Sequence, residues 1–328
     1  MHLLKNRIFI GALTVLFLGL AAMPTQAAYP TKQITCIQPG SPGGGADALG
    51  QITQPILEKL LGKGFINQYL PGASGSIAYT KLSKQTKNDG YTIMICTTPH
   101  IYASFIRTPD QITYRLDDFE PLANIVTDPN VIVVSASSPF KTFEDFMEAC
   151  KAKPGQVTVS NSGISGDDLL ALLMLEKASG IKTQPVPFDN DGPSWQAAMG
   201  NKVDVSVNNL GVVYPQVKAG NLRILAIMTA ERYHLVPDVP TLKEKGYDIQ
   251  NGSSRGYTAP KGIPAEAKKA LLDAIQTMAK DPVFLDACEK RALPVDIKLD
   301  GDFMDHLKKG AEAYGEVWET VKDQFANK

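Results

Sequence analysis

The sequence predicts an α/β protein, in which mainly parallel strands form sheets covered by helices. Three observations support this class. Apolar runs rich in β-branched residues recur along the chain, helical patterns separate most of them, and glycine-rich turns follow two of the runs. The chain has 328 residues, which exceeds the usual size of one domain, so two domains are expected.

The N-terminus has the pattern of a secretory signal peptide. Lys5 and Arg7 precede an apolar stretch over 8–22, and Thr25-Gln26-Ala27 places small residues at a cleavage site. An uncleaved membrane anchor is the alternative, but this stretch is short for a span of ~20 residues. We therefore expect residues 1–27 to be removed and the mature protein to be soluble and periplasmic.

Strand-like runs and helical patterns then alternate. Strands are expected at 33–38, 92–97, 131–135, 156–160, 203–207 and 222–228. Leu49, Ile52, Ile56 and Leu60 share one helical face, and Pro55 is expected either to kink that helix or to delay its regular part. Apolar spacing predicts two further helices, after Pro264 and over 303–321.

Several helix ends have characteristic residues. Thr142 with Asp145 predicts a capping box, and Gly180 predicts the end of a helix that begins at Asp168. Ser194 is expected to cap a helix over 195–199. Asp281 followed by proline predicts another helix start.

Charge excludes one class of partner. Removing Lys5 and Arg7 from the 33 basic residues leaves 31 against 34 acidic residues, a net charge near −3. A nucleic-acid-binding protein needs a basic patch, which this balance does not supply. Among the four cysteines, Cys36 and Cys96 lie in apolar runs and read as buried thiols. Cys150 and Cys288 either pair in an oxidising compartment or stay free.

Signals for cofactors and catalysis are weak. Gly43-x-Gly45-x-x-Ala48 fits the loose dinucleotide fingerprint, but the next strand-like stretch, 65–69, carries no acid to hold a ribose. The turns at 72–76 and 163–166 miss the G-x-S-x-G spacing by one position. We expect no cofactor, no metal site and no enzyme, with an exported enzyme acting on a carboxylate as the less favoured alternative.

The glycine-rich turns are the strongest functional signal. One spans 39–47 and the other 160–168, each between a strand-like and a helical run. Such a turn presents backbone N–H groups at a helix start, which suits an anion. Other polar residues follow strand ends, where open α/β sheets bind ligands. The predicted ligand-binding residues are Ser41, Gly43, Gly44, Gly45, Ala46, Asp47, Ser74, Thr97, Thr98, His100, Ser162, Gly163, Ser165, Gly166, Asp167, Phe188, Asp189, Asn208 and Arg255.

Two of these predictions carry an alternative. Arg255 is flanked by small residues and can reach a second carboxylate of the ligand, or it can be a structural arginine. We expect Arg255→Ala to weaken binding more than tenfold without loss of folding. The Asp167-Asp168 pair suggests acid–base chemistry, but its position at a helix start favours capping.

Ordered motifs then identify a family. They include Pro42-Gly43-Gly44-Gly45-Ala46-Asp47, Pro71-Gly72-Ala73-x-Gly75, Asp89-Gly90-Tyr91-Thr92, Lys153-Pro154-Gly155, Pro237-Asp238-Val239-Pro240-Thr241 and Ala259-Pro260-Lys261-Gly262-x-Pro264. From Tyr29 to the final helix, the chain resembles the tripartite tricarboxylate transporter substrate-binding proteins, the Bug family of periplasmic receptors. Two segments depart from the family pattern, at 68–70 and at 188–192.

The resemblance implies a type II periplasmic-binding-protein fold. Two α/β lobes joined by two crossing strands would close around a ligand cleft. Lobe 1 would combine 29–126 with 229–328, and lobe 2 would be 127–228. It also implies a monomer that captures a di-, tri- or aromatic carboxylate between the two turns and delivers it to a tripartite-type permease. A sensory receptor that feeds a membrane kinase would use the same fold, so that alternative stays open.

Overall fold

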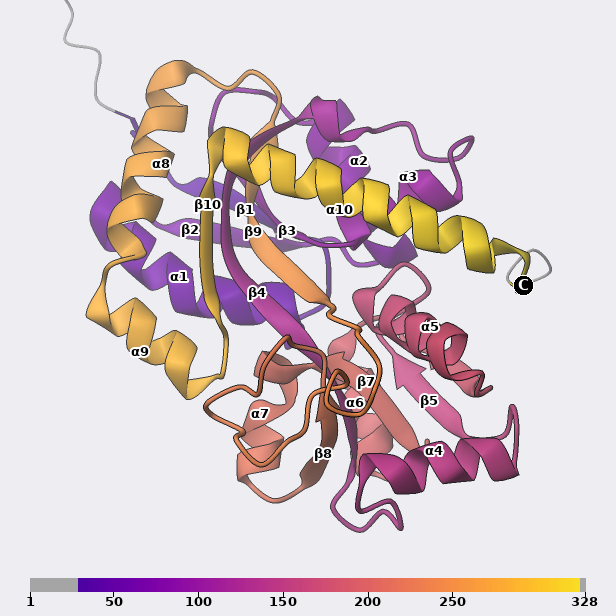
Figure 1. Ribbon diagram of the computed structural model, residues 1–328. Helices are drawn as coiled ribbons and strands as arrows, with labels where there is room; N and C mark the ends of the chain where they lie inside the picture. Colours follow the sequence, from indigo (N-terminus) through magenta and orange to yellow (C-terminus); the bar gives the residue numbers. More distant parts are fainter. Residues whose placement is uncertain (1–28, 325–328) are drawn as a thin grey trace, which may run out of the picture.

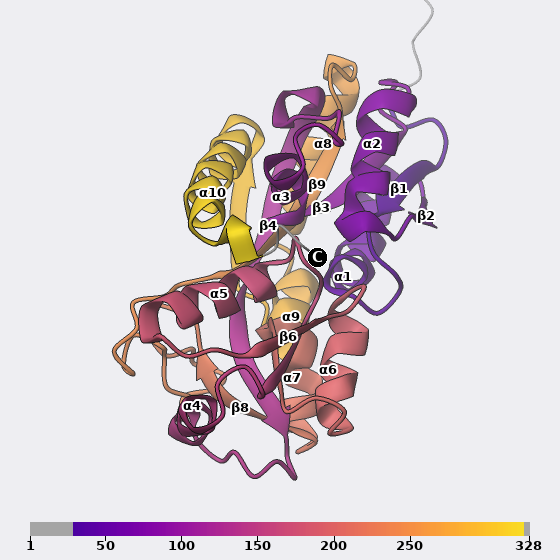
Figure 2. The same cartoon turned by 90° about the vertical axis from the view of Figure 1, so that its right-hand side faces the viewer.

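The computed structural model describes residues 29–324, so the predicted signal peptide lies outside the described residues. Within 29–324, no helix is long and apolar enough to cross a bilayer. The described strands form a mixed sheet with the order β2-β1-β3-β9-β4-β7-β5-β6, with β8 and β10 also paired to β4. Helices cover the sheet in an upper and a lower lobe, as Figures 1 and 2 show from two sides.

The upper lobe is built around a parallel trio of strands. β1 (Ile34–Gln38) pairs in parallel with β2 (Phe65–Tyr69) and β3 (Thr92–Thr97). β3 then pairs antiparallel with β9 (Gly252–Pro260). The helices of this lobe are α1 (Gly45–Leu61), α2 (Ser76–Gln85), α3 (His100–Arg107), α8 (Ala265–Met278), α9 (Pro282–Lys290) and α10 (Asp300–Val321).

The lower lobe repeats this plan with a second parallel trio. β5 (Thr158–Asn161) pairs in parallel with β6 (Gln184–Pro187) and β7 (Val205–Asn209). The helices here are α4 (Phe143–Ala152), α5 (Asp167–Ser179), α6 (Asp191–Met199) and α7 (Leu210–Lys218). In each lobe a strand, a glycine-rich turn and a helix follow one another, which brings both turns to strand ends.

β4 (Phe119–Ser135) connects the two lobes. Its first part pairs antiparallel with β9 and with β10 (Val295–Leu299), and its last residues pair with β7 and with β8 (Leu222–Ile227). Figure 1 shows β4 running through both lobes. The expected mainly parallel sheet is therefore wrong in detail, because β4 and β9 run antiparallel to their neighbours.

The buried side chains form separate cores in the two lobes. Ile34, Ile93 and Tyr257 belong to one core of the upper lobe, and Val159 and Val205 belong to one core of the lower lobe. Three residues from the later chain, Leu242, Ile249 and Val321, also pack into that lower core. The exact boundaries of the lobes at 126/127 and 228/229 stay a prediction.

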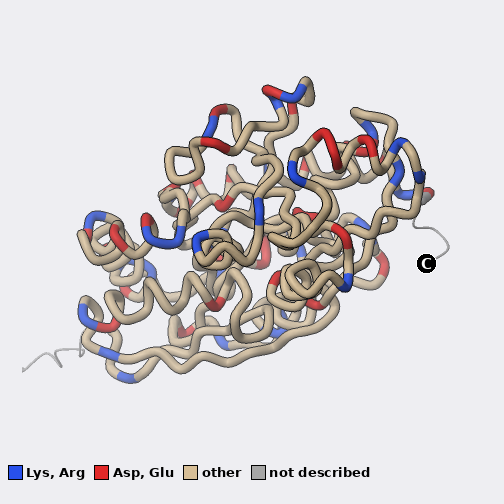
Figure 3. The backbone as a smooth tube through the Cα atoms, turned by 90° about the horizontal axis from the view of Figure 1, so that it is seen from below, with Lys and Arg blue, Asp and Glu red and all other residues tan. Residues whose placement is uncertain are grey.

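The four cysteines are buried and free. Cys150 lies in a core of the lower lobe and Cys288 in a core of the upper lobe, so the two thiols do not meet. Figure 3 shows basic and acidic residues interspersed along the described chain, in keeping with the near-neutral composition.

Most predicted helix ends are confirmed. Thr142 and Asp145 form a capping box, Gly180 ends α5 in the left-handed conformation, and Asp281 caps α9. The cap at Ser194 is wrong. α6 begins at Asp191, because the Asn190 side chain accepts a hydrogen bond from the backbone N–H of Gly192. α1 continues through Pro55 as one helix.

Candidate functional site

A cavity of about 60 Å³ lies where the two glycine-rich turns come together. That volume is several times the ~10–15 Å³ that one water needs, so it suits a small polar ligand. The lining residues are Pro39, Gly40, Ser41, Gly44, Gly45, Ala46, Gly72, Ser74, Gly75, Thr97, His100, Ser162, Asp167, Asp189, Asn190, Asp191, Asn209, Ser253 and Arg255.

The first turn is fastened by the carboxylate of Asp47. Its Oδ2 accepts a hydrogen bond from the backbone N–H of Gly43 at 2.9 Å, and its Oδ1 accepts one from the Tyr69 hydroxyl at 2.6 Å. Gly43 has φ +85°, a left-handed conformation that glycine adopts without strain. Gly44 is the N-cap of α1, and Gly44, Gly45 and Ala46 line the cavity, so the start of this helix, whose first N–H groups have no partner within the helix, lies at the cavity wall.

The second turn is fastened in the same way. Asp168, in the first turn of α5, accepts a hydrogen bond from the backbone N–H of Ser162 at 3.0 Å. Its neighbour Asp167 accepts from the side-chain amides of Asn130 and Asn209, at 2.8 and 2.7 Å. The capping interpretation of the acidic pair is not confirmed, because Gly166 is the N-cap of α5 without a side-chain cap bond and Asp168 instead fastens the turn that precedes the helix. Asp167 lines the cavity.

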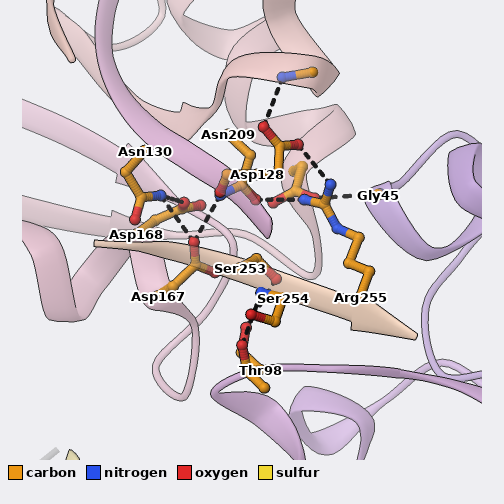
Figure 4. Close-up of polar contacts among 12 residues, drawn as sticks. Gly45, Thr98, Asp128, Asn130, Asp167, Asp168, Asn209, Ser253, Ser254 and Arg255 are labelled. Carbon is orange, nitrogen blue, oxygen red and sulfur yellow. Dashed lines mark hydrogen bonds and ion pairs between the residues drawn. The ribbon is translucent and has the colours of Figure 1, made fainter. Parts of the chain in front are cut away.

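Arg255 connects the site to β4. Its guanidinium donates to Asp128 at 2.5 Å and to the Asn209 side-chain oxygen at 2.6 Å, as Figure 4 shows. The other oxygen of Asp128 accepts from the backbone N–H of Gly211. Burial is the largest single influence and would lower the pKa of Arg255, but the carboxylates of Asp128, Asp191 and Asp167 together outweigh it and raise the pKa.

This arrangement corrects one expectation. Arg255 is buried and its charge is neutralised by Asp128, so it does not stand free for a second ligand carboxylate. Removing it would leave a buried carboxylate without a partner, which is strongly destabilising. The expectation that Arg255→Ala leaves folding intact therefore does not fit the structure.

Burial also controls the protonation of three other groups. It raises the pKa of Asp167 to about 7, with the Asp191 charge as the next cause, and raises the pKa of Asp168 well above its usual range. Burial lowers the pKa of His100, so that imidazole is neutral at physiological pH. Since His100 is neutral and Arg255 is paired with Asp128, the described wall of the cavity offers an anion hydrogen bonds instead of a free cation.

Two lining side chains have unsatisfied polar atoms. Neither the Ser162 hydroxyl nor Nδ1 of His100 has a hydrogen-bond partner among residues 29–324, and both atoms are buried. Buried polar atoms are nearly always paired in folded proteins. A ligand or a water in the cavity would supply the hydrogen-bond partners that these two atoms lack.

Eleven of the predicted residues line the cavity, and they come from the turns and strand ends named above: Ser41, Gly44, Gly45, Ala46, Ser74, Thr97, His100, Ser162, Asp167, Asp189 and Arg255.

The other eight predicted residues do not line the cavity. Most of them have structural contacts instead. Gly43 and Asp47 brace the first turn, and Gly163 and Gly166 form the second. Thr98 accepts from the backbone N–H of Ser254 and ties β3 to β9 (Figure 4). The remaining residues are Phe188, Ser165, which accepts from Arg107, and Asn208, which donates to the carbonyl of Asp191.

Sequence reasoning missed the residues that begin α6. Asn190 and Asp191 line the cavity, whereas the prediction from segment 188–192 named Phe188 and Asp189. The misplaced cap at Ser194 explains this omission. With the helix expected to begin only after Ser194, Asn190 and Asp191 were not recognised as the residues at its start. Ser253 was also missed. No cluster of His, Cys, Asp or Glu in the described part of the chain could hold a metal ion.

A larger hollow of about 780 Å³ lies elsewhere, lined by Tyr102, Tyr233, His306 and Lys309 among others. No residue of either glycine-rich turn lines it. We regard the smaller cavity as the candidate site, because both turns, the unsatisfied Ser162 hydroxyl and the N-terminus of α1 converge there.

Comparisons with known proteins agree on one family. Residues 51–308 match the model of the tripartite tricarboxylate transporter family receptor. The chain is 26% identical to BugT of Bordetella pertussis over 293 residues, covering 85% of this chain and 90% of BugT. It is 30% identical over 279 residues to a UPF0065 protein of Cupriavidus necator, covering 83% of each chain.

Solved structures show the same fold. A periplasmic transporter with 29% identity superposes with a TM-score of 0.85 and covers 90% of this chain and 98% of its own. MatC from Rhodopseudomonas palustris, with bound malate, has 22% identity and a TM-score of 0.81, covering 88% of this chain and 99% of its own. An R. palustris protein with adipate has 24% identity and a TM-score of 0.82, covering 90% and 98%.

Proposed function

Since this chain belongs to the tripartite tricarboxylate transporter receptor family, we propose that it is a periplasmic receptor that captures a small organic carboxylate and delivers it to a tripartite-type membrane permease. The role is binding without chemistry. The family match supports the permease as partner, and the secretory pattern at 1–27 supports the periplasmic location.

The observation that carries the proposal is the cavity between the two turns. The first residues of α1, Gly45 and Ala46, line it, and a helix N-terminus favours negative charge. Ser41, Ser74 and Thr97, which carry hydroxyl groups, line the same space. Such N–H and O–H groups can donate several hydrogen bonds to a ligand carboxylate, so that binding does not require a dedicated cation.

The energetics of such a site suffice for capture. Micromolar binding needs about 8 kcal/mol. Hydrogen bonds to a charged group contribute roughly 1.5–3 kcal/mol each, so a few of them with some apolar burial offset the cost of ordering the ligand. A ligand that touches both lobes binds the closed form better, and only that difference in affinity drives closure.

The chemical class of the ligand is supported by the family. Malate and adipate, found in two proteins of the same fold, are both dicarboxylates. The departure from the family pattern at 188–192 places Asp189, Asn190 and Asp191 on the cavity wall. We therefore propose a small carboxylate as the ligand and leave its far end to be determined by experiment.

Calorimetric titration of the mature chain tests the proposal. The panel contains malate, adipate, citrate and benzoate, with glucose as an uncharged control. We expect at least one carboxylate to bind with a Kd of about 100 μM or below, and glucose not to bind. Absence of binding to every carboxylate in the panel, by a chain with a cooperative unfolding transition, would contradict the proposed function.

A further inference from the structure

The carboxylate of Asp191 lies at the N-terminus of α1. Its Oδ2 accepts a hydrogen bond from the backbone N–H of Gly45 at 3.3 Å. Gly45 is the first residue of α1, and its N–H is one of the four that a helix leaves without an internal partner. Asp191 belongs to the lower lobe and Gly45 to the upper lobe, so this bond crosses the cleft.

Asp191 is held in this position by its own helix start. The Asn190 side chain accepts from the N–H of Gly192 at 2.9 Å, and Asn208 donates to the Asp191 carbonyl at 3.4 Å. A methyl group placed on Gly192 would lie 3.9 Å from the carbonyl oxygen of Gly43. The start of α6 therefore packs against the first glycine-rich turn.

The same N–H groups are those offered to a ligand carboxylate. Ser162, whose hydroxyl is buried and unpaired among the described residues, lines the same cavity and provides an independent sign of a ligand position. Arg255, the lining cation, is already paired with Asp128. An incoming carboxylate thus meets the side chain of Asp191 at the place where the helix favours negative charge most.

We propose that Asp191 is a specificity-determining residue whose carboxylate competes with the carboxylate of the ligand for the N-terminus of α1. This inference rests on the proposed function. The ligand must displace the Asp191 carboxylate from the Gly45 N–H, and the displaced side chain stays in the cavity. Ligands with a second negative charge close to Asp191 are then disfavoured relative to ligands that bring a hydrogen-bond donor there.

Asp189 provides a matched control. It lines the same cavity two residues earlier and carries the same charge, but the structure gives its side chain no hydrogen bond to Gly45. Asp191→Ala and Asp189→Ala therefore remove the same charge from one cavity, and only the first frees the N–H of Gly45. A difference between the two variants in exchange or in affinity therefore reports on the hydrogen bond between Asp191 and Gly45, and not on the charge of the cavity alone.

The first experiment needs no ligand. Amide hydrogen exchange is measured on peptides covering 40–48 in the wild type and both variants, with cooperative unfolding of each variant checked separately. We expect exchange at Gly45 to rise at least about threefold in Asp191→Ala, the equivalent of losing one helix-terminus interaction, and to stay at the wild-type rate in Asp189→Ala. Equal exchange in the two variants would overturn the proposal.

The second experiment is calorimetric titration with malate and adipate. We expect Asp191→Ala to bind them at least about threefold more tightly than Asp189→Ala does. Weaker binding by Asp191→Ala than by Asp189→Ala would overturn the proposal, because it would show that Asp191 holds the ligand directly. If the wild type binds no carboxylate, the proposed function fails, while the exchange comparison still decides whether Asp191 occupies the helix terminus.

Discussion

The guanidinium of Arg255 lies 2.5 Å from the carboxylate of Asp128, and the two side chains are 2% and 0% exposed. Arg255 comes from β9 and Asp128 from β4, the two strands that run side by side where the lobes meet. Asn209, at the end of β7, also accepts a hydrogen bond from the guanidinium, as Figure 4 shows, so these contacts join three strands at the cavity wall.

Arg255→Ala is expected to destabilise the fold by about 3–5 kcal/mol, because it leaves the buried Asp128 charge without a partner. Urea unfolding measures the change. Arg232→Ala is the control, since Arg232 pairs with Glu244 at the surface and such pairs contribute about 0–1 kcal/mol. A loss below about 1 kcal/mol for Arg255→Ala would refute the structural role of the pair.

Gly45→Ala is expected to cost about 1–3 kcal/mol and to weaken carboxylate binding. A methyl group at Gly45 would lie 2.4 Å from the guanidinium carbon of Arg255, which the ion pair holds in place. Gly40→Ala is the matched control: Gly40 lines the same cavity, but no described atom lies within 4 Å of its added methyl. Thermal unfolding and calorimetry that gave equal changes for both variants would contradict this packing argument.

Ser162→Ala is expected to weaken carboxylate binding about threefold to tenfold with little effect on stability. The reason is that the Ser162 hydroxyl has no partner among the described residues to lose. Ser165→Ala is expected to do the reverse, because Ser165 accepts a hydrogen bond from Arg107 at 3.0 Å and does not line the cavity. Calorimetry and urea unfolding of both variants test this, and a larger stability loss for Ser162→Ala would count against it.

The stability of the fold is expected to fall with rising pH through Asp167. Its pKa is raised by burial to about 7, against about 3.9 in the unfolded chain. The folded state therefore holds the proton more tightly, so this contribution is complete below about pH 4 and is lost as pH rises to about 7.

The test compares unfolding free energies of the wild type and Asp167→Asn between pH 5 and 8. Asp168, Asp191 and Arg255 face Asp167 and are unchanged in the variant. The wild type should lose stability relative to the variant by up to about 1.4 kcal/mol per pH unit below pH 7. A difference that is constant, or that grows with pH in favour of the wild type, would be inconsistent with a raised pKa.

Strands with strong apolar character were predictable from the sequence, and β9 was not. β3 was predicted at its observed bounds, because Ile93, Met94 and Ile95 are apolar and buried. β9 begins Gly-Ser-Ser-Arg-Gly, which has little strand propensity of its own. It forms because it pairs along its length with β4 and β3, contacts between residues far apart in the chain that local patterns do not reveal.

The candidate site shows the same limit. Residues in the glycine-rich turns were predictable, because glycine and small polar residues after a strand have a local physical meaning. Asn190 and Asp191 were missed, since their place depends on where α6 starts and on how the lobes meet. The partner of Arg255 was equally hidden, because Asp128 lies 127 positions away in the sequence.

A crystal structure of the mature chain, grown with the carboxylate that binds most tightly in calorimetry, tests the central claim most directly. A ligand carboxylate is expected within hydrogen-bonding distance of the Gly45 N–H, between the two glycine-rich turns. A ligand bound instead in the hollow lined by Tyr102, His306 and Lys309, with the turns unoccupied, would contradict it.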